Sequence, residues 1–501
     1  MWLPYPIPEE AVCRSAVKRG FGPVGPMVDA LNPRFMPWIE VRVADIYFDI
    51  SDLIAYASAH ATVSGIQRVQ IRLLSELARA PRAENTWCVA VHPQGRGSVA
   101  WRLADIGADI EHDLRIFHRL ADGIAGRGRR NVVRRHVNQL GLRGWRRAIH
   151  KVGAYSRLLL DTATEVEPVH GMHLSHLPQE ATLVILGAGW NDPCAAAFAA
   201  DHAGRGGRVV QCVYDLIPIM YPTYFDTSLA QSFSRHLSQA VGYASEFVCI
   251  SQRTQDDLHA YLRDRNLRLP STVVPLAHEF HGHPRNARGC QPDDGTLLAF
   301  GSRGRDFVLC VGTLEIRKNG MALLEAWLRL RSQLGDATPL LLFCGRRGWK
   351  VDPFFDLLQR DEWLKHRVRI ISGAHDNDIA YLHEQSLCSV YPSLYEGWGL
   401  PVGEAAWFGR TCITSKESSL PEVCGPLVDY VDPRNPRDIA GRVCHAVLDR
   451  GRLRRRERLI SAARLRTWRE VASDFHQVVH GADGATIHLD RFRSSHLRRA
   501  A

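Results

Sequence analysis

One stretch of the chain, residues 389–422, restricts the possible fold more than any other part of the sequence. At its centre Glu396 and Glu404 are separated by seven residues, three of which are glycines. Residues 388–391 are typical of a short buried strand, and Pro401 suits the first turn of a helix, where its missing N–H is not needed. The stretch therefore predicts a loop between a strand end and a helix start, which is where open α/β sheets bind ligands.

The residue types in this loop indicate which ligand it would bind. Gly397 and Gly399 allow close approach of the backbone, and a helix N-terminus favours a negatively charged group. Glu404, in the first helical turn, would accept hydrogen bonds from vicinal hydroxyls such as those of a ribose, and Glu396 would hold a second polyol. The loop thus predicts a sugar-nucleotide site, although the spacing alone also fits a glycine turn before a helix whose dipole Glu404 complements.

The sequence YPSLYEGWGLPVGEA resembles the E-x7-E donor motif of retaining glycosyltransferases of family 4, and residues 418–423, SSLPEV, resemble the segment that follows it. The resemblance covers most of residues 306–440. It implies an α/β fold of the GT-B type, with two Rossmann-like domains that face a central cleft. It also implies donor contacts from Gly397, Trp398, Gly399, Leu400 and Glu404.

A second motif follows the apolar strand expected at 306–311. Arg317 and Lys318 come just before a predicted helix, where cations are unfavourable, so their place predicts a bound anion such as a diphosphate. The alternative is a solvated basic pair. The segment resembles the family's VGTLEPRKN form, in which the residues matching Arg317 and Lys318 hold the donor diphosphate. Thr313 stands where an arginine is common, and Gly345 ends the next strand, which in the family lies near the nucleobase.

The first half of the chain alternates predicted strands, at 45–50, 182–186, 208–213 and 247–250, with predicted helices. This alternation favours a parallel Rossmann-like sheet.

Two segments of this half resemble parts of the family's active site. Gly65 precedes a helix, which Ser64 could cap, in a loop similar to the family's glycine loop opposite the donor phosphates. Tyr214 and Asp215 resemble the HDLxP segment on the acceptor side of the cleft, but Tyr214 replaces the usual histidine, which weakens a role as a base. Asp215 either contacts the acceptor or shapes a turn.

A chain of 501 residues is too long for a single core. The predicted organisation is an irregular segment at 1–40, an acceptor domain at 41–285 with a basic insertion at about 116–157, a linker at 286–304, a nucleotide-sugar domain at 305–465, and a closing helix and tail at 466–501.

The net charge of +10 suits an anionic partner. The insertion at 116–157 is either solvated or contacts anionic lipid or a lipid-linked acceptor. Nucleic acid is not expected, because no RNA-binding motif accompanies the charge. Residues 450–466 are also very basic.

We expect no metal and no cofactor beyond the donor substrate. His278, His281 and His283 fit no metal-ligand spacing, and the aspartates at 376 and 378 are expected at a helix start rather than in a metal-binding DxD motif. The scattered cysteines indicate reduced thiols. No signal peptide or membrane span is evident, which predicts a cytoplasmic protein, with peripheral contact to the inner membrane face as a further hypothesis.

Together these features predict a glycosyltransferase that transfers a hexose, with retention, from a nucleotide-diphosphate sugar to a glycan or lipid-linked acceptor in polysaccharide biosynthesis. Mannose from GDP-mannose is the first choice, because the TLExRKN form resembles bacterial polysaccharide mannosyltransferases. The catalytic residues implied are Glu396, Lys318, Arg317 and Asp215. The alternatives are a UDP-sugar-dependent transferase and a catalytically silent sugar-nucleotide-binding protein, which Tyr214 and Thr313 keep open; a sugar-nucleotide 2-epimerase is disfavoured.

Overall fold

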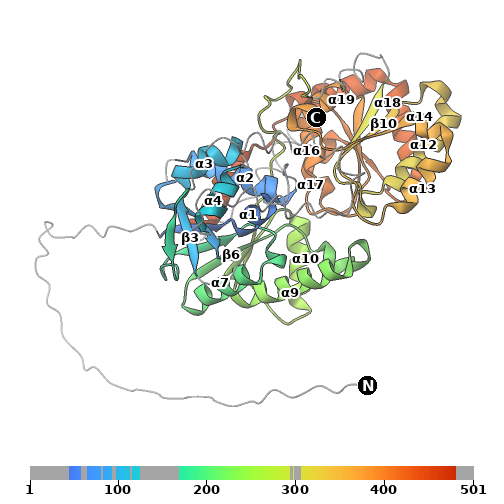
Figure 1. The fold of residues 1–501 in the computed structure, drawn as a ribbon. Coiled ribbons are helices and arrows are strands. Elements are labelled where there is room, and N and C mark those ends of the chain that lie inside the picture. The colour runs from blue at the N-terminus through green and yellow to red at the C-terminus, as the bar shows by residue number, and fades with distance from the viewer. Residues whose placement is uncertain are drawn as a thin grey trace, which may run out of the picture. The chain divides into compact units, whose positions relative to one another are not determined.

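The computed structural model describes residues 44–57, 65–80, 83–92, 97–112, 115–124, 169–293, 297 and 306–480. Within these residues the chain builds two β-sheets, and helices pack against both (Figure 1). The predicted segment 1–40, residues 125–157 of the basic insertion, Ser64, most of 294–304 and the tail after 480 lie outside the described residues.

The first sheet, sheet A, has eight strands among the described residues, in the order β4-β3-β2-β1-β5-β6-β7-β8. Strands β2, β1 and β5 to β8 run parallel, whereas β3 and β4 add an antiparallel edge. The strands are β1 Ile46–Asp49, β2 Thr86–Val91, β3 Ser98–Arg102, β4 Met172–Leu174, β5 Thr182–Ile185, β6 Arg208–Val213, β7 Glu246–Cys249 and β8 Ser271–Val273.

The prediction of a parallel sheet in this half is therefore correct for its centre and wrong for this edge. The short connection between Val91 and Ser98 explains the difference, because only antiparallel neighbours can be joined by so few residues.

The second sheet, sheet B, is parallel throughout its described strands, in the order β11-β10-β9-β12-β13-β14. Its central strands are almost entirely apolar and buried, as expected for a sheet covered on both faces. The strands are β9 Phe307–Val311, β10 Leu340–Cys344, β11 Val368–Ile371, β12 Cys388–Tyr391, β13 Cys412–Ser415 and β14 Asp429–Val431.

Helices cover both sheets and bury apolar stripes against them. Those in the first half are α1 Ser51–Ala57, α2 Ile66–Ala78, α3 Leu103–His112, α4 Arg115–Ile124, α7 Pro193–Gly204, α8 Ile217–Met220, α9 Thr227–Tyr243 and α10 Gln252–Arg263. Those in the second half are α12 Gly320–Leu334, α13 Asp352–Arg360, α14 Glu362–Arg367, α15 Asp376–Gln385, α16 Leu400–Trp407, α17 Leu420–Cys424, α18 Pro436–Leu448, α19 Arg450–Ala462 and α20 Trp468–His480. In the part of the chain that the structure describes, no helix combines the length and the apolar character that a bilayer span needs.

Helix α4 shows that the basic insertion starts later in the chain than predicted. Its side chains Ile116, Phe117, Leu120 and Ile124 are buried in the core that also holds β1 and α2, so residues 116–124 are part of the packed fold. The insertion predicted to begin at about 116 can thus begin only after Ile124. The sequence prediction missed this because the apolar residues of α4 adjoin a long run of arginines.

The last helix, α20, returns to the first half of the chain. Phe475 lies 6.4 Å, between ring centroids, from Phe48 of β1, and the guanidinium of Arg208 donates to the backbone carbonyls of Val478 and Val479. The predicted closing helix is therefore present, and it completes the core around sheet A.

Candidate active site

The loop that holds Glu396 connects β12 to α16, as the sequence predicts. Gly399 is the residue before the helix and has φ of 127°, and a Cβ atom there would lie 2.6 Å from the side chain of Leu420. Glycine is thus required by both backbone conformation and space. Pro401 occupies the first turn of α16, where no hydrogen bond from its nitrogen is needed.

Glu396 is buried between two cations from the β9 side of sheet B. Its carboxylate oxygens lie 2.5 Å from a guanidinium nitrogen of Arg317 and 2.5 Å from Nζ of Lys318. Burial alone would raise the pKa of Glu396, but the charges of Arg317 and Lys318 outweigh it and lower the pKa to about 2. The glutamate therefore remains ionised, and the three side chains form one compact charged cluster.

Arg317 and Lys318 lie in a 3-10 turn, Ile316–Lys318, and not in the first turn of α12 itself. Asn319, with φ of 61°, separates this turn from the helix. The anion that the sequence predicts beside these cations is supplied in this structure by protein carboxylates. Arg317 pairs with Glu315 at 2.6 Å as well as with Glu396, and a diphosphate would have to compete with these contacts.

Asp215 and Tyr214, after β6 of sheet A, lie against the same loop. A Cβ atom on Gly397 would meet the carbonyl oxygen of Tyr214 at 2.0 Å and Cβ of Asp215 at 3.0 Å. The close approach that Gly397 permits is therefore to the protein backbone. Asp215 accepts a hydrogen bond from the N–H of Ile217 at 3.0 Å, so its turn-forming role is real, and burial raises its pKa although Arg317 opposes the shift.

Glu404 faces Arg68, a residue that the sequence analysis did not assign to the site. One guanidinium nitrogen of Arg68 lies 3.5 Å from the Glu404 carboxylate, and the other lies 2.6 Å from that of Asp376. Burial raises the pKa of Glu404, and the charge of Arg68 only partly offsets this. The available signal was the position of Arg68 in the first turn of the helix that begins after Gly65. Gly65 itself has φ of 55° and open space around its Cβ position.

The other predicted donor-binding residues shape the loops around this cluster. Trp398 is buried in the core, and Leu400 packs against the same core. A Cβ atom on Gly345 would lie 2.0 Å from the carbonyl oxygen of Gly312, so this glycine brings the ends of β9 and β10 together. Thr313 lies in that same junction, where its methyl group would be 2.8 Å from a Cβ atom on Gly348.

Further contacts between the loops of the two sheets were also not predicted from the sequence. The carboxylate of Glu422 accepts hydrogen bonds from the backbone N–H groups of Gln252 and Arg253, at 2.7 and 2.9 Å, at the start of α10. Tyr395, next to Glu396, donates its hydroxyl to Asp257 of α10 at 2.6 Å. The SSLPEV segment contains this glutamate, but nothing in the sequence names its partner. These contacts fix the Glu396 loop against sheet A.

The aspartates of the DxD triplet are engaged within the protein. Both lie in the first turn of α15, as expected: Asp376 pairs with Arg68, and Asp378 accepts the backbone N–H of the N-cap residue His375 at 2.8 Å, as in a capping box. His278 is buried, accepts the N–H of Arg466 at 3.0 Å and donates to the carbonyl of Val423 at 2.6 Å. Among the described residues no group of three or more His, Cys, Asp or Glu side chains is arranged to hold a metal ion.

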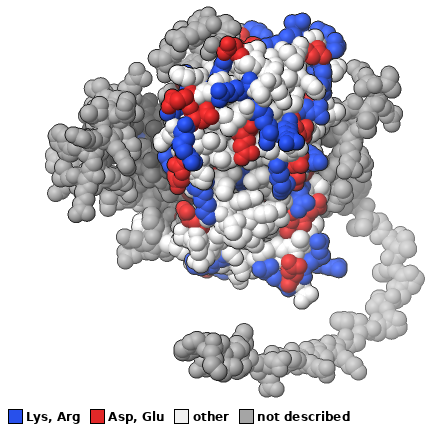
Figure 2. Space-filling model, turned by 90° about the vertical axis from the view of Figure 1, so that its right-hand side faces the viewer, with Lys and Arg blue, Asp and Glu red and all other residues white. Residues whose placement is uncertain are grey.

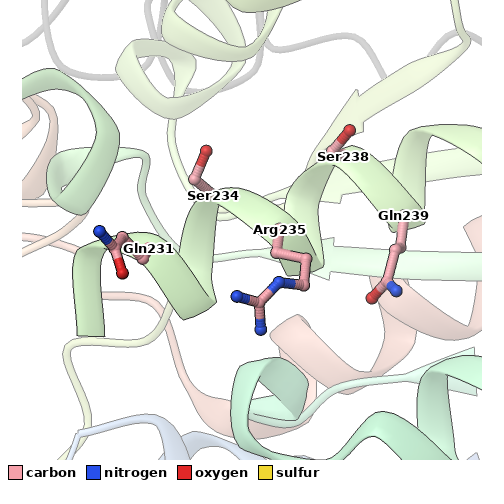
Figure 3. Close-up of a pocket in the computed structure, with 5 residues that line it drawn as sticks. All are labelled: Gln231, Ser234, Arg235, Ser238 and Gln239. Atoms are coloured by element: carbon pink, nitrogen blue, oxygen red, sulfur yellow. The ribbon is translucent and has the colours of Figure 1, made fainter. Parts of the chain in front are cut away.

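A separate hollow runs along the exposed face of α9 (Figure 3). All the side chains that line it come from this one helix, and they are Gln231, Ser234, Arg235, Ser238 and Gln239. Because no second element contributes a group, the hollow lacks the convergent polar contacts of a ligand site. The Glu396 cluster is the stronger candidate.

Comparison with known proteins finds a family match for the part of the chain that contains the Glu396 loop. Residues 301–466 match the family described as glycosyl transferases group 1. The chain is similar to O-antigen chain mannosyltransferase B of Escherichia coli, with 27% identity over 245 residues, which cover 48% of this chain and 62% of that protein. It is also similar to serotype-specific mannosyltransferase WbdA of Escherichia coli, with 25% identity over 46% of this chain and 28% of the relative. The chain thus spans less than two thirds of either relative.

Solved structures show the same fold at low sequence identity. Anabaena Alr3699/HepE, crystallised in complex with UDP and glucose, superimposes with a TM-score of 0.53 and 11% identity, over 88% of this chain and all of that one. The α,α-trehalose-phosphate synthase (UDP-forming) of Burkholderia xenovorans gives a TM-score of 0.51 with 12% identity, over 87% of this chain and 100% of that chain. The described chain therefore has the two-sheet GT-B fold, and its residues 301–466 are similar to the glycosyl transferases group 1 family.

Proposed function

We propose that this chain is a retaining hexosyltransferase that transfers mannose from GDP-mannose to a glycan or lipid-linked acceptor during polysaccharide biosynthesis. The observation that carries the proposal is the buried cluster in which Glu396 lies between Arg317 and Lys318, beside Asp215 of the other sheet. This cluster joins two cations, suited to a diphosphate, with a carboxylate suited to sugar hydroxyls.

The proposed chemistry assigns each group a role. When the glycosidic bond to the diphosphate breaks, negative charge develops on the leaving group, and Arg317 and Lys318 would stabilise it. Glu396 would hold the hydroxyls of the transferred sugar, and Glu404 those of the ribose. The acceptor hydroxyl would pass its proton to a phosphate oxygen of the donor, on the face from which the diphosphate leaves. We assign no protein nucleophile and no metal.

The choice of mannose rests on the relatives. Both matched Escherichia coli proteins are mannosyltransferases, and one acts on O-antigen chains. The UDP complex of the Anabaena protein supports a nucleotide site in this fold without defining the base for this chain.

The donor can be identified by thermal shift of the whole chain with GDP, UDP, ADP and their sugar conjugates, because a ligand stabilises the native state that binds it. We expect a shift with GDP and GDP-mannose alone. A shift with UDP compounds alone would replace the donor but keep the site. A folded sample that shifts with none of them, and releases no nucleotide from any donor, would refute the proposal.

Retention needs a separate measurement. The NMR spectrum of the first product formed from GDP-α-mannose should show an α-linkage. A β-linkage would overturn the mechanism even if mannose transfer is confirmed.

We also propose a cytoplasmic location, with contact to the inner membrane face through residues 125–157 of the basic insertion. This segment lies outside the described residues, so the support comes from its sequence alone. Deletion of 125–150 should weaken binding to anionic vesicles, and unchanged binding would contradict this contact.

A further inference from the structure

Helix α19, Arg450–Ala462, contains six arginines and one acidic residue. The acidic residue, Glu457, is already paired with Arg410 at 2.9 Å. Three of the arginines have carboxylate partners inside the fold. Arg450 pairs with Asp306, and Arg452 and Arg456 lie 3.0 and 3.1 Å from Asp429. These three arginines hold the helix on the sheet B half.

The other three arginines, Arg454, Arg455 and Arg458, are exposed and have no ion pair among the described residues. Residues three or four apart lie on the same side of a helix, so Arg458 neighbours both Arg454 and Arg455. Leu459 lies four residues after Arg455, so it is on the same side of the helix as well. The four side chains therefore share one outward face of α19.

Leu459 and Leu448 are the most exposed large apolar side chains among the described residues. Leu459 is 66% exposed, and Leu448, at the end of α18, is 69% exposed. The remaining exposed apolar side chains of comparable size are at most 45% exposed. Two exposed leucines eleven residues apart, one of them on the same face of α19 as the three arginines, distinguish this part of the chain from the rest of the described residues.

Some exposed cations elsewhere in the described chain have carboxylate neighbours. Arg347 lies 2.5 Å from Asp352, and Lys365 lies 2.5 Å from Glu362. Figure 2 shows one face of the molecule on which basic and acidic side chains are interspersed in this way. The three arginines on the outer face of α19 have no such partner among the described residues, since the one acidic side chain of this helix, Glu457, is paired with Arg410.

We propose that Leu448, Arg454, Arg455, Arg458 and Leu459, here called the α19 surface, bind the surface of an anionic lipid bilayer. Guanidinium groups would pair with lipid phosphates, and the two leucines would enter the boundary between head groups and acyl chains. The charge of the arginines and the apolar character of the leucines are both needed for such a contact.

The leucines decide between a bilayer and other polyanions. Nucleic acid would be bound through the arginines and phosphates alone, and two exposed leucines would add nothing to an electrostatic contact. A bilayer surface uses both kinds of side chain. The inference concerns residues outside the Glu396 cluster, so it does not depend on the proposed function.

The test is co-sedimentation of the full chain with vesicles of phosphatidylcholine containing about 30% phosphatidylglycerol. The triple change Arg454→Glu, Arg455→Glu and Arg458→Glu should weaken the partition coefficient about 100-fold, since each basic residue near such a surface contributes about a factor of five. The double change Leu448→Ser and Leu459→Ser should weaken it about tenfold. Both variants should keep the thermal shift of the parent with its nucleotide, which shows that they fold.

A matched control removes the same charge elsewhere. Arg235, Arg263 and Arg268 are exposed residues of the sheet A half, and their change to glutamate gives the same net charge as the triple variant. This control should bind vesicles within about threefold of the parent. Equal loss in the control and the triple variant would overturn the proposal in favour of a general charge effect. Loss with the arginine changes but not with the leucine changes would overturn the lipid assignment, and unchanged binding in both would overturn the surface itself.

Discussion

At the carboxyl ends of the two sheets, the pKa values of buried carboxyl groups are shifted in opposite directions. At sheet B, Arg317 and Lys318 keep Glu396 ionised and lower its pKa to about 2. At sheet A, Asp49 and Asp215 lie buried where burial dominates, so the pKa of Asp49 rises to about 7 and that of Asp215 is also raised. The same type of sheet edge therefore holds a charged cluster in one half and carboxyl groups with a raised pKa in the other.

This difference suits two kinds of ligand. An edge with two fixed cations stabilises a polyanion such as a diphosphate, whereas weakly acidic carboxyl groups are suited to hydroxyls. Asp52, at the same edge as Asp49, has one buried carboxylate oxygen without a hydrogen-bond partner, while the other accepts from Gln70 and from the N–H of Ala188. This asymmetry is the basis for the proposal that sheet B holds the donor and that the acceptor enters over sheet A.

The largest expected effect breaks the charged cluster. Glu396→Gln should lower turnover roughly 100- to 1,000-fold, the range seen when one group that stabilises a transition state is removed. Affinity for the nucleoside diphosphate should not fall, because Arg317 and Lys318 lose the carboxylate that competes with a phosphate. Steady-state kinetics and calorimetric titration measure the two quantities. Glu325→Gln, on the exposed side of α12, is the control, and full turnover in Glu396→Gln would remove Glu396 from the mechanism.

The second prediction tests the neutral edge through pH. The pKa of Asp49 is about 7 in the folded chain and near 3.8 when unfolded, so the folded state binds the extra proton between these values. Stability due to Asp49 therefore falls as pH rises from about 4 to 7 and then stays constant. Asp49→Asn should stabilise the chain more at pH 8 than at pH 5, by about 3 kcal/mol in unfolding free energy, read from urea titrations.

The comparison needs a carboxylate that is not buried. Asp264→Asn, at the exposed end of α10, should change stability equally at both pH values. An equal gain from Asp49→Asn at pH 5 and pH 8 would show that Asp49 is ionised in the folded chain.

The third prediction sharpens the role of the cations. Lys318→Met should weaken binding of GDP or UDP roughly 10- to 100-fold, the value of a charge-assisted hydrogen bond, and leave the affinity for the free nucleoside unchanged. Lys365→Met, on the surface helix α14, provides the control. Equal weakening of nucleoside and diphosphate would place Lys318 away from the phosphates.

The smallest expected effect concerns Glu404. Glu404→Ala should weaken donor binding about fivefold with little change in turnover, because about one hydrogen bond to the ribose is lost. The 2′-deoxy and 3′-deoxy nucleoside diphosphates sharpen the test. At least one of them should bind the parent more weakly than the ribonucleotide does, and should bind the variant as tightly as the ribonucleotide does. If each deoxy compound binds more weakly than the ribonucleotide by the same factor in the variant and in the parent, Glu404 does not contact the ribose. Arg68→Ala then tells whether the 3.5 Å pair supports Glu404.

The sequence was sufficient wherever the determining contacts are local. The strands Arg208–Val213 and Cys388–Tyr391 lie at the predicted residues, because short apolar runs between turn signals specify them. The prediction that Lys318 lies just before a helix was nearly correct for the same reason.

The sequence was insufficient where distant segments meet. Arg68 and Glu404 are 336 residues apart, and Glu422 and Gln252 are 170 apart, and no periodic pattern encodes either pair. The sequence also does not show that a carboxylate competes with a diphosphate for Arg317. It predicts that Arg317 needs an anion, but not that Glu396 supplies it. Such pairings depend on how the loops of both sheets pack.

Helix α20 sets the order in which the chain can finish folding during synthesis. The last strand of sheet A ends at Val273, but the helix that packs on β1 begins only at Trp468. At about 5–20 residues per second, the ribosome needs roughly 10–40 s to make the roughly 200 residues between them. During that time Phe475 has not been made, so it cannot cover the apolar surface around Phe48. The first half of the nascent chain is therefore most prone to aggregation, and most accessible to chaperones, in this period.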